Sequence, residues 1–218
     1  KFSTTTAAEF TDALLSLKSK GMKKLVLDLR GNSGGFLQSA IDVADHFLPE
    51  KDLIVYTEGY NRSKEVAYAT SKGLFEKGDL VVLVDEGSAS SSEIVAGALQ
   101  DNDRANIIGR RSFGKGLVQE QLSLPDGSAI RLTVAKYYTP SGRSIQKPYV
   151  NGHSEEYESE LFERMMKGEY ESKDSIKLND SIEYRTKSGK IVYGGGGIMP
   201  DIFIPIERNE NYKYYNKY

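Results

Sequence analysis

The feature that most constrains the fold is an alternation of short apolar runs with amphipathic stretches, joined by turns rich in glycine or serine. Lys24 to Leu29 (KLVLDL) predicts a buried strand, and Asp79 to Asp85 (DLVVLVD) has the continuous apolar character of a strand buried on both faces. Each run is followed by a turn of small residues and then by a helical pattern, at about Phe36 to Leu48 and at Ser90 to Leu99. Strand, turn and helix in this order predict an α/β domain.

Weaker sequence patterns predict the remaining helices and strands. Thr6 and Glu9 have the spacing of a capping box, which predicts the start of a helix. The remaining predicted elements are a helix that runs from Thr6 and stops at Gly21, short strands at 53–57 and 106–109, and a hairpin in which residues 117–124 turn at Pro125-Asp126-Gly127 and return as residues 129–138.

The length of 218 residues fits one large domain or a domain with an appendage. We expect residues 1–206 to form that domain, with a polar insertion at about 152–190 that holds one helical piece at 157–166. Residues 207–218 form a polar, tyrosine-rich tail that we expect to fray. No run of 18 apolar residues occurs, so the sequence predicts no membrane-spanning helix. Because the chain starts at Lys1 and enters structured sequence at once, we expect it to be cut from a longer protein.

The composition excludes several classes of function. Lys and Arg number 29 against 31 Asp and Glu, a net charge of −2, so the chain lacks the basic excess that nucleic-acid binding needs. It has no cysteine, which excludes thiol catalysis, disulfides and cysteine-bound zinc. His46 and His153 are the only histidines, too few for a site built from several. We therefore expect no metal and no cofactor.

The first candidate segment is the turn from Gly31 to Gly35 (GNSGG), between the strand at 24–29 and the next helix. Glycine lets a ligand approach the backbone closely, and a helix N-terminus carries unpaired N–H groups and a positive dipole. The turn therefore suits an anion, either a phosphate or the oxyanion of a reacting carbonyl. The dinucleotide pattern G-x-G-x-x-G is absent, which disfavours a Rossmann site. A tight turn without any ligand fits the same residues.

The second candidate segment runs from Gly87 to Glu93 (GSASSSE) and again joins a strand to a helix. A serine at such a junction points out of the sheet edge beside the first N–H groups of the helix, which is the geometry of a nucleophile with an oxyanion donor. Ser90 and Glu93 also have the spacing of a capping box. Taken alone, this segment favours the capping interpretation.

The third candidate segment, Gly109 to Gly116, matches G-x-x-x-x-G-K of a phosphate-binding P-loop. Gly116, however, stands where a Ser or Thr holds magnesium. A P-loop also leads into a helix, whereas the residues after Lys115 alternate as a strand. Both conditions fail, so we reject nucleotide binding.

Lys115 could instead act as a general base. A reactive serine needs a base, and neither histidine has suitable surroundings for that role. A lysine acts as a base when it is neutral, and burial favours the neutral form. Phe113 and Leu117 give Lys115 an apolar setting. Gln119, two residues beyond Leu117, could orient the amine without adding a charge that would stabilise the ammonium.

Together these motifs resemble the protease domain of the C-terminal processing (tail-specific) serine endopeptidases. Four segments match the family in order: residues 27–35 (LDLRGNSGG), 87–101 (GSASSSEIVAGALQD), 112–119 (SFGKGLVQ) and 195–201 (GGGIMPD). The resemblance runs from about Phe2 to Pro205. The combination is specific to the family, although no single segment is.

The resemblance implies three catalytic residues: the nucleophile Ser90, the base Lys115 and the lysine-orienting residue Gln119. It also implies an oxyanion hole made by the N–H of Ser91 and by the N–H of either Gly34 or Gly35, between which it does not choose. Position 91 departs from the family, which commonly has alanine there.

The implied fold is a ClpP/crotonase-like α/β fold of ββα units, with the antiparallel hairpin added. The implied function is a serine endopeptidase that cleaves unfolded or tail-tagged proteins through a Ser–Lys dyad and an acyl-enzyme. A non-catalytic peptide-binding relative of the same fold is the alternative. The family also implies a PDZ domain in the full-length protein, for which this chain has no room. The location it implies is outside the cytoplasm, in the bacterial periplasm or cell envelope, or in a thylakoid lumen.

Overall fold

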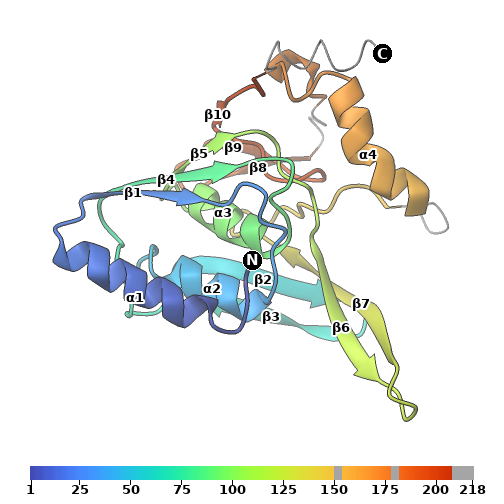
Figure 1. The fold of residues 1–218 in the computed structure, drawn as a ribbon, viewed down its shortest axis with the longest axis horizontal. Coiled ribbons are helices and arrows are strands. Elements are labelled where there is room, and N and C mark those ends of the chain that lie inside the picture. Colours follow the sequence, from blue (N-terminus) through green and yellow to red (C-terminus); the bar gives the residue numbers. More distant parts are fainter. Residues whose placement is uncertain (150–153, 178–181, 208–218) are drawn as a thin grey trace, which may run out of the picture.

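A computed structural model describes residues 1–149, 154–177 and 182–207 and folds them into helices packed against two main sheets (Figure 1). The helices are α1 (Thr6–Ser19), α2 (Leu37–Asp45), α3 (Ser91–Asp101), α4 (Ser154–Met166) and the 3₁₀ helix η1 (Lys173–Ser175). The strands are β1 (Lys24–Asp28), β2 (Leu53–Gly59), β3 (Arg62–Tyr68), β4 (Asp79–Val84), β5 (Asn106–Gly109), β6 (Leu117–Ser123), β7 (Ala129–Tyr138), β8 (Glu183–Arg185), β9 (Ile191–Tyr193) and β10 (Ile202–Phe203). The predicted α/β fold is confirmed.

The first sheet is parallel and has the strand order β1-β4-β5-β10. In β4, Leu80, Val82 and Val84 are buried, whereas the alternate residues are only partly covered, and Val26 of β1 is 61% exposed. The expectation that β4 is buried on both faces is therefore wrong, and β1 is less buried than predicted. Helices α1, α2 and α3 all lie on one side of this sheet, which leaves its other face largely uncovered (Figure 1).

The second sheet is antiparallel and has the order β3-β2-β7-β6. Its β6–β7 hairpin is where the sequence predicts it, and it projects from the body of the molecule (Figure 1). Strand β3 is not predicted, because its sequence RSKEVAY is mostly polar and exposed and it forms only by pairing with β2. A register shift separates Val118 from Gln119 in β6, where the pairing with β7 is irregular.

Helix α3 lies between the two sheets, and all of its residues from Ser91 to Asp101 are buried (Figure 1). Small residues allow this close packing. A Cβ atom on Gly97, for example, would lie 2.7 Å from the Thr139 methyl group. Because α3 is fixed on both sides, the residue at its N-terminus has a fixed place at the end of β4.

Two local predictions need correction or refinement. Thr6 is the first residue of α1 rather than its cap: Thr5 occupies the N-cap position, and the Thr6 hydroxyl accepts a hydrogen bond from Ser3 N. The capping box at Thr6 and Glu9 is therefore wrong. In the predicted polar insertion, α4 is held against the body by Arg164, which is buried and donates to the carbonyls of Arg111 and Ser112.

The C-terminal part of the described chain returns to the parallel sheet. The β8–β9 pair was not predicted, because these three-residue strands are too short to show a pattern. Strand β10 then pairs with β5 at the sheet edge. Residues 208–218, which hold most of the predicted tail, and His153 lie outside the described residues. Among the helices described, none is both long and apolar enough to cross a membrane.

Candidate active site

Ser90 occupies a strained turn between β4 and α3. Its backbone has φ 56° and ψ −116°, a conformation that non-glycine residues adopt rarely and at an energetic cost. Ser90 is the N-cap of α3, so the first N–H groups of that helix surround it. Its side chain is partly exposed, in contrast to the buried residues on either side. The turn therefore has the character of a nucleophile elbow.

The three neighbouring serines differ from Ser90 because each is buried and donates its hydroxyl to a backbone carbonyl. Ser88 Oγ donates to Leu29 O at 2.8 Å. Ser91 Oγ donates to Gly35 O at 2.9 Å, and Ser92 Oγ donates to Asn32 O at 2.7 Å. These serines tie the turn to the loop after β1 and are not free to react. This favours Ser90 among the four serines of the segment.

The loop after β1 lies directly against the Ser90 turn. Ala89 N donates to Asn32 O at 3.0 Å. Gly34 has φ +87°, and a Cβ atom there would lie 2.7 Å from Ser91 N and 2.8 Å from the Ser90 Cβ. Only glycine fits this approach. The contact brings together two segments that the sequence singles out separately.

The structure also distinguishes Gly34 from Gly35. The N–H of Gly34 is already donated to Asn32 Oδ1 at 3.0 Å. No acceptor is assigned to the N–H of Gly35 within the described part of the chain, and the first helical residue Ser91 has no intrahelical acceptor for its own N–H. A donor for an oxyanion has to be free, so this pattern favours Gly35 over Gly34.

Glu93 connects the Ser90 turn to the loop that carries Lys115. Its side chain is completely buried, and both carboxylate oxygens accept hydrogen bonds. Oε2 accepts from Ser90 N at 2.8 Å and from Lys115 N at 2.9 Å. Oε1 accepts from Ser112 Oγ at 2.5 Å and from Gly114 N at 2.7 Å. The backbone nitrogens of Ser90 and Lys115 thus lie on either side of a single oxygen atom.

Of these four hydrogen bonds, the sequence predicts only the one from Ser90 N. The bond from Ser90 N is the glutamate half of a capping box, so that interpretation and a reactive Ser90 are compatible. The three bonds from residues 112–115 could not be foreseen from spacing, because they depend on how the loop folds back. Burial raises the pKa of Glu93, and the four donated hydrogen bonds oppose this by favouring the carboxylate.

Lys147 is a buried lysine near the site, and no sequence motif points to it. Its Nζ lies 4.2 Å from the ring centres of both Phe113 and Tyr157. Burial lowers the pKa of Lys147, and its ion pair with Glu160 at 3.1 Å opposes the shift. Because Nζ also donates to Tyr157 O at 2.8 Å, this lysine is engaged and is a poor candidate for a base.

The hydrogen bond of the Gln119 side chain is made within the hairpin and not with Lys115. Lys115 precedes β6, and the register shift at Val118 intervenes. The Gln119 side chain is exposed, and its amide donates to Thr133 Oγ1 at 3.5 Å across the hairpin. Its role as the residue that orients Lys115 stays a prediction.

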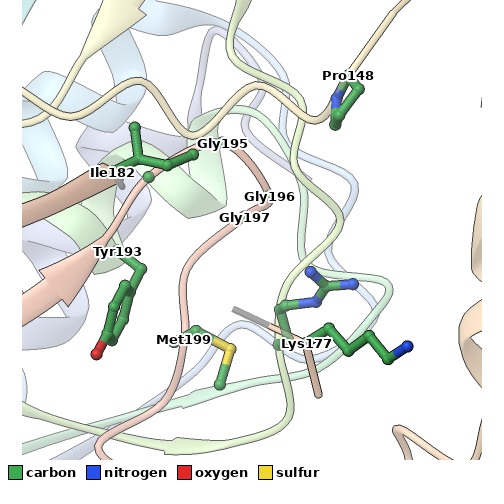
Figure 2. A pocket seen from close by; sticks show the side chains of 10 residues that line it. Pro148, Lys177, Ile182, Tyr193, Gly195, Gly196, Gly197 and Met199 are labelled. Carbon is green, nitrogen blue, oxygen red and sulfur yellow. The ribbon is translucent and has the colours of Figure 1, made fainter. Parts of the chain in front are cut away.

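A cavity of about 260 Å³ lies beside Arg111 and Pro148 (Figure 2). The glycine turn 194–197 forms one wall, and Tyr193, Met199 and Ile182 add apolar surface, while the Lys177 side chain extends away from the turn. None of the predicted site residues lines this cavity. In the described residues, no three His, Asp or Glu side chains cluster as metal ligands would.

Comparisons with known proteins agree with the arrangement of these segments. Residues 1–155 match the model of peptidase family S41. The carboxyl-terminal-processing protease of Synechocystis sp. is 46% identical over 147 residues, and the carboxy-terminal processing protease CtpA of Bacillus subtilis is 45% identical over 146 residues. Each alignment covers 67% of this chain but only 34% and 31% of the two relatives, so the chain spans about a third of their length.

A solved structure extends the likeness to most of the chain. The photosystem II D1 C-terminal processing protease superposes with a TM-score of 0.65 at 29% sequence identity. That match covers 94% of this chain and 40% of the other. It reaches past residue 155, where the match to the family model ends.

Proposed function

The chain belongs to peptidase family S41, together with its carboxyl-terminal-processing relatives, and we propose that it is a serine endopeptidase with a Ser90–Lys115 dyad. The observation that carries this proposal is the shared contact with Glu93, whose Oε2 accepts from both Ser90 N and Lys115 N. It makes one buried carboxylate the common support of the nucleophile and the base.

In the proposed reaction, Ser90 Oγ attacks the carbonyl carbon of the scissile peptide bond while Lys115 Nζ takes the hydroxyl proton. The carbonyl oxygen becomes an oxyanion, which the N–H groups of Ser91 and Gly35 stabilise. Collapse of this intermediate breaks the C–N bond, and the lysine proton passes to the leaving amine. Water then attacks the acyl-enzyme by the same route and releases the new carboxyl end, which restores Ser90.

The substrate in this proposal is an extended polypeptide. β6 is an edge strand of the second sheet and begins two residues after Lys115, so its free backbone groups can pair with a substrate strand next to the dyad. Unfolded or tail-tagged proteins supply such strands. Gln119 stands on this strand, which keeps it available to orient Lys115 once substrate is bound.

The wider context is also proposed from the family. Its members carry a PDZ domain, which we expect in the full-length protein, and they act outside the cytoplasm, so we place the whole protein in the bacterial periplasm or cell envelope. A non-catalytic peptide-binding relative is the alternative function. The partly exposed side chain of Ser90 on a strained turn favours the enzyme, because binding alone does not require either feature.

The proposal is tested by labelling with a fluorophosphonate and by single-turnover acylation in wild type, Ser90→Ala, Lys115→Ala and Lys115→Arg. We expect one label, on Ser90, and no acylation in the three variants. Arginine keeps the charge but cannot give up its proton, so it cannot act as the base. Labelling at another serine, or substantial acylation by Lys115→Arg, would contradict the dyad. Ser92→Ala is the matched control for labelling, because it removes a hydroxyl from the same turn.

A further inference from the structure

Tyr137 in β7 contacts both halves of the proposed dyad, and neither the sequence motifs nor the proposed reaction uses it. Its ring is buried with 2% of its surface exposed. Its hydroxyl donates a hydrogen bond to the carbonyl of Lys115, and its backbone N–H donates to Gly116 O at 3.0 Å. Two consecutive residues of the Lys115 loop are thus held by one tyrosine.

The Ser90 side chain is a close neighbour of the same hydroxyl. A phenol has one proton to donate. That proton is given to Lys115 O, so the hydroxyl holds the Lys115 backbone beside the Ser90 turn.

Tyr137 complements the contact through Glu93. The carboxylate of Glu93 holds the backbone N–H groups of Ser90 and Lys115, whereas the Tyr137 hydroxyl holds the carbonyl of Lys115. Burial raises the pKa of Tyr137 well above its usual range, and the nearby Glu93 charge adds to this shift. The phenol therefore keeps the proton that it donates throughout the range in which a peptidase works.

We propose that Tyr137 is a positioning residue, whose hydroxyl fixes the Lys115 backbone against the Ser90 hydroxyl and so sets the geometry of proton transfer. This inference rests on the proposed dyad. Proton transfer requires heavy atoms within hydrogen-bond reach, and small displacements are costly to the rate. Without the phenol, Lys115 keeps one backbone anchor, its N–H bond to Glu93.

The test is single-turnover acylation by Tyr137→Phe across pH 6 to 10, with Tyr138→Phe as the matched control. Tyr138 is the next residue, but it faces away from the site and stacks on Tyr56 at 4.9 Å. We expect Tyr137→Phe to acylate about tenfold more slowly, as one lost hydrogen bond predicts, with the substrate KM nearly unchanged. We also expect the pH profile of its acylation to differ from that of wild type, because the Lys115 loop is held less firmly. Tyr138→Phe should match wild type in both respects.

The outcomes separate this inference from the function on which it rests. If Ser90→Ala and Lys115→Ala lose acylation while a folded Tyr137→Phe keeps the wild-type rate and pH profile, the positioning role is wrong and the dyad stands. If Ser90→Ala or Lys115→Ala acylates normally, the proposed function fails and this inference fails with it.

A second variant covers the case in which Tyr137→Phe does not fold. A tetrafluorotyrosine at position 137 keeps the ring and the hydroxyl but makes the phenol more acidic. Once ionised, it has no proton for the Lys115 carbonyl, so we expect acylation to fall at an alkaline pH where wild type is still active. An unchanged alkaline limb would overturn the proposal.

Discussion

Gly34 shows how closely two chain segments approach at the candidate site. Its Cα lies so near the Ser90 turn that an added methyl group would meet the backbone, at 2.5 Å from Ala89 O and 2.7 Å from Ser91 N. Neither atom is the flexible end of a side chain, so the turn or the loop would have to move. The position of Ser91 N–H, one of the two proposed oxyanion donors, depends directly on this contact.

Gly34→Ala is therefore expected to displace the Ser90 turn and to lower the acylation rate on the order of a hundredfold. Gly31→Ala is the matched control, because Gly31 also has a positive φ, of +64°, but has open space where its Cβ would lie. Both variants bear the cost of an L side chain at positive φ, so the difference between them isolates the contact. Acylation rates of the two purified variants measure it. Equal rates would show that the close approach does not matter for reaction.

The two carboxylate oxygens of Glu93 accept hydrogen bonds from four donors. Glu93→Gln replaces one oxygen with an NH₂ group that would face two donors, and each buried donor left unsatisfied costs roughly 1–3 kcal/mol. We expect lower stability in urea unfolding and slower acylation. Glu86→Gln is the control, because Glu86 is only partly buried and pairs with the Arg110 side chain instead of holding backbone donors. A Glu93→Gln variant as stable as Glu86→Gln would contradict the role given to this carboxylate.

At the scale of elements, the contact between α1 and α2 contains a half-buried histidine, His46, whose surroundings favour the neutral ring. His46 Nε2 lies 2.8 Å from Thr11 Oγ1, and that hydroxyl donates its own hydrogen to Ala7 O. The ring therefore donates from Nε2, and its Nδ1 is buried without a partner among the described residues. Protonation would place a second N–H at an atom that has no acceptor. Burial accordingly lowers the pKa of His46, although the nearby Asp45 and Asp42 oppose the shift.

This shift predicts a pH dependence of stability. The unfolded chain binds a proton at this histidine near the ordinary pKa of about 6.5, before the folded chain does, so the folded state loses stability as the pH falls through that value. The loss is at most about 1.4 kcal/mol per pH unit. Urea unfolding of wild type and His46→Gln at pH 7.5 and 5.5 checks it. We expect the variant to lose less stability than wild type over this interval, and an identical loss would count against a neutral buried ring.

The elements that could be predicted are those with a local cause. The apolar runs of β1 and β4, the helix α3 and the β6–β7 hairpin each carry their own periodicity or turn residues, and each is where the sequence indicates it. Strand β3 could not be predicted, because only its partner β2 stabilises it. In the candidate site too, features with a local cause could be predicted and long-range contacts could not. Ser90 and Lys115 stand out in motifs, whereas the bond from Lys115 N to Glu93 joins residues 22 positions apart and exists only in the folded chain.

For the molecule as a whole, the C-terminal segment supports the candidate site from behind. Ile198 N donates to Ser112 Oγ at 2.7 Å, and Ser112 Oγ donates to Glu93 Oε1 at 2.5 Å. Ser112 N returns a bond to Ile198 O at 3.1 Å. The last parallel strand, β10, begins four residues later and fixes this segment to β5. A chain of hydrogen bonds therefore leads from the end of the sheet to Glu93, and from Glu93 to Ser90 N.

Gly197 is the point at which this support can be tested without removing any part of the chain. It has φ +86°, and a Cβ atom there would lie 2.6 Å from Ser112 O and 2.9 Å from Ser112 Oγ. Gly189 has a similar φ of +92° but nothing within 4 Å of its Cβ position, so Gly189→Ala carries the same backbone cost of roughly 1–2 kcal/mol without the clash. We expect Gly197→Ala to displace Ser112 and with it the Glu93 carboxylate. Its acylation rate should then fall well below that of Gly189→Ala, even at temperatures where both variants are folded. Fluorophosphonate labelling rates, measured beside thermal unfolding curves, separate the two effects. If the two alanine variants label equally fast when equally folded, the C-terminal segment stabilises the sheet but does not position Ser90.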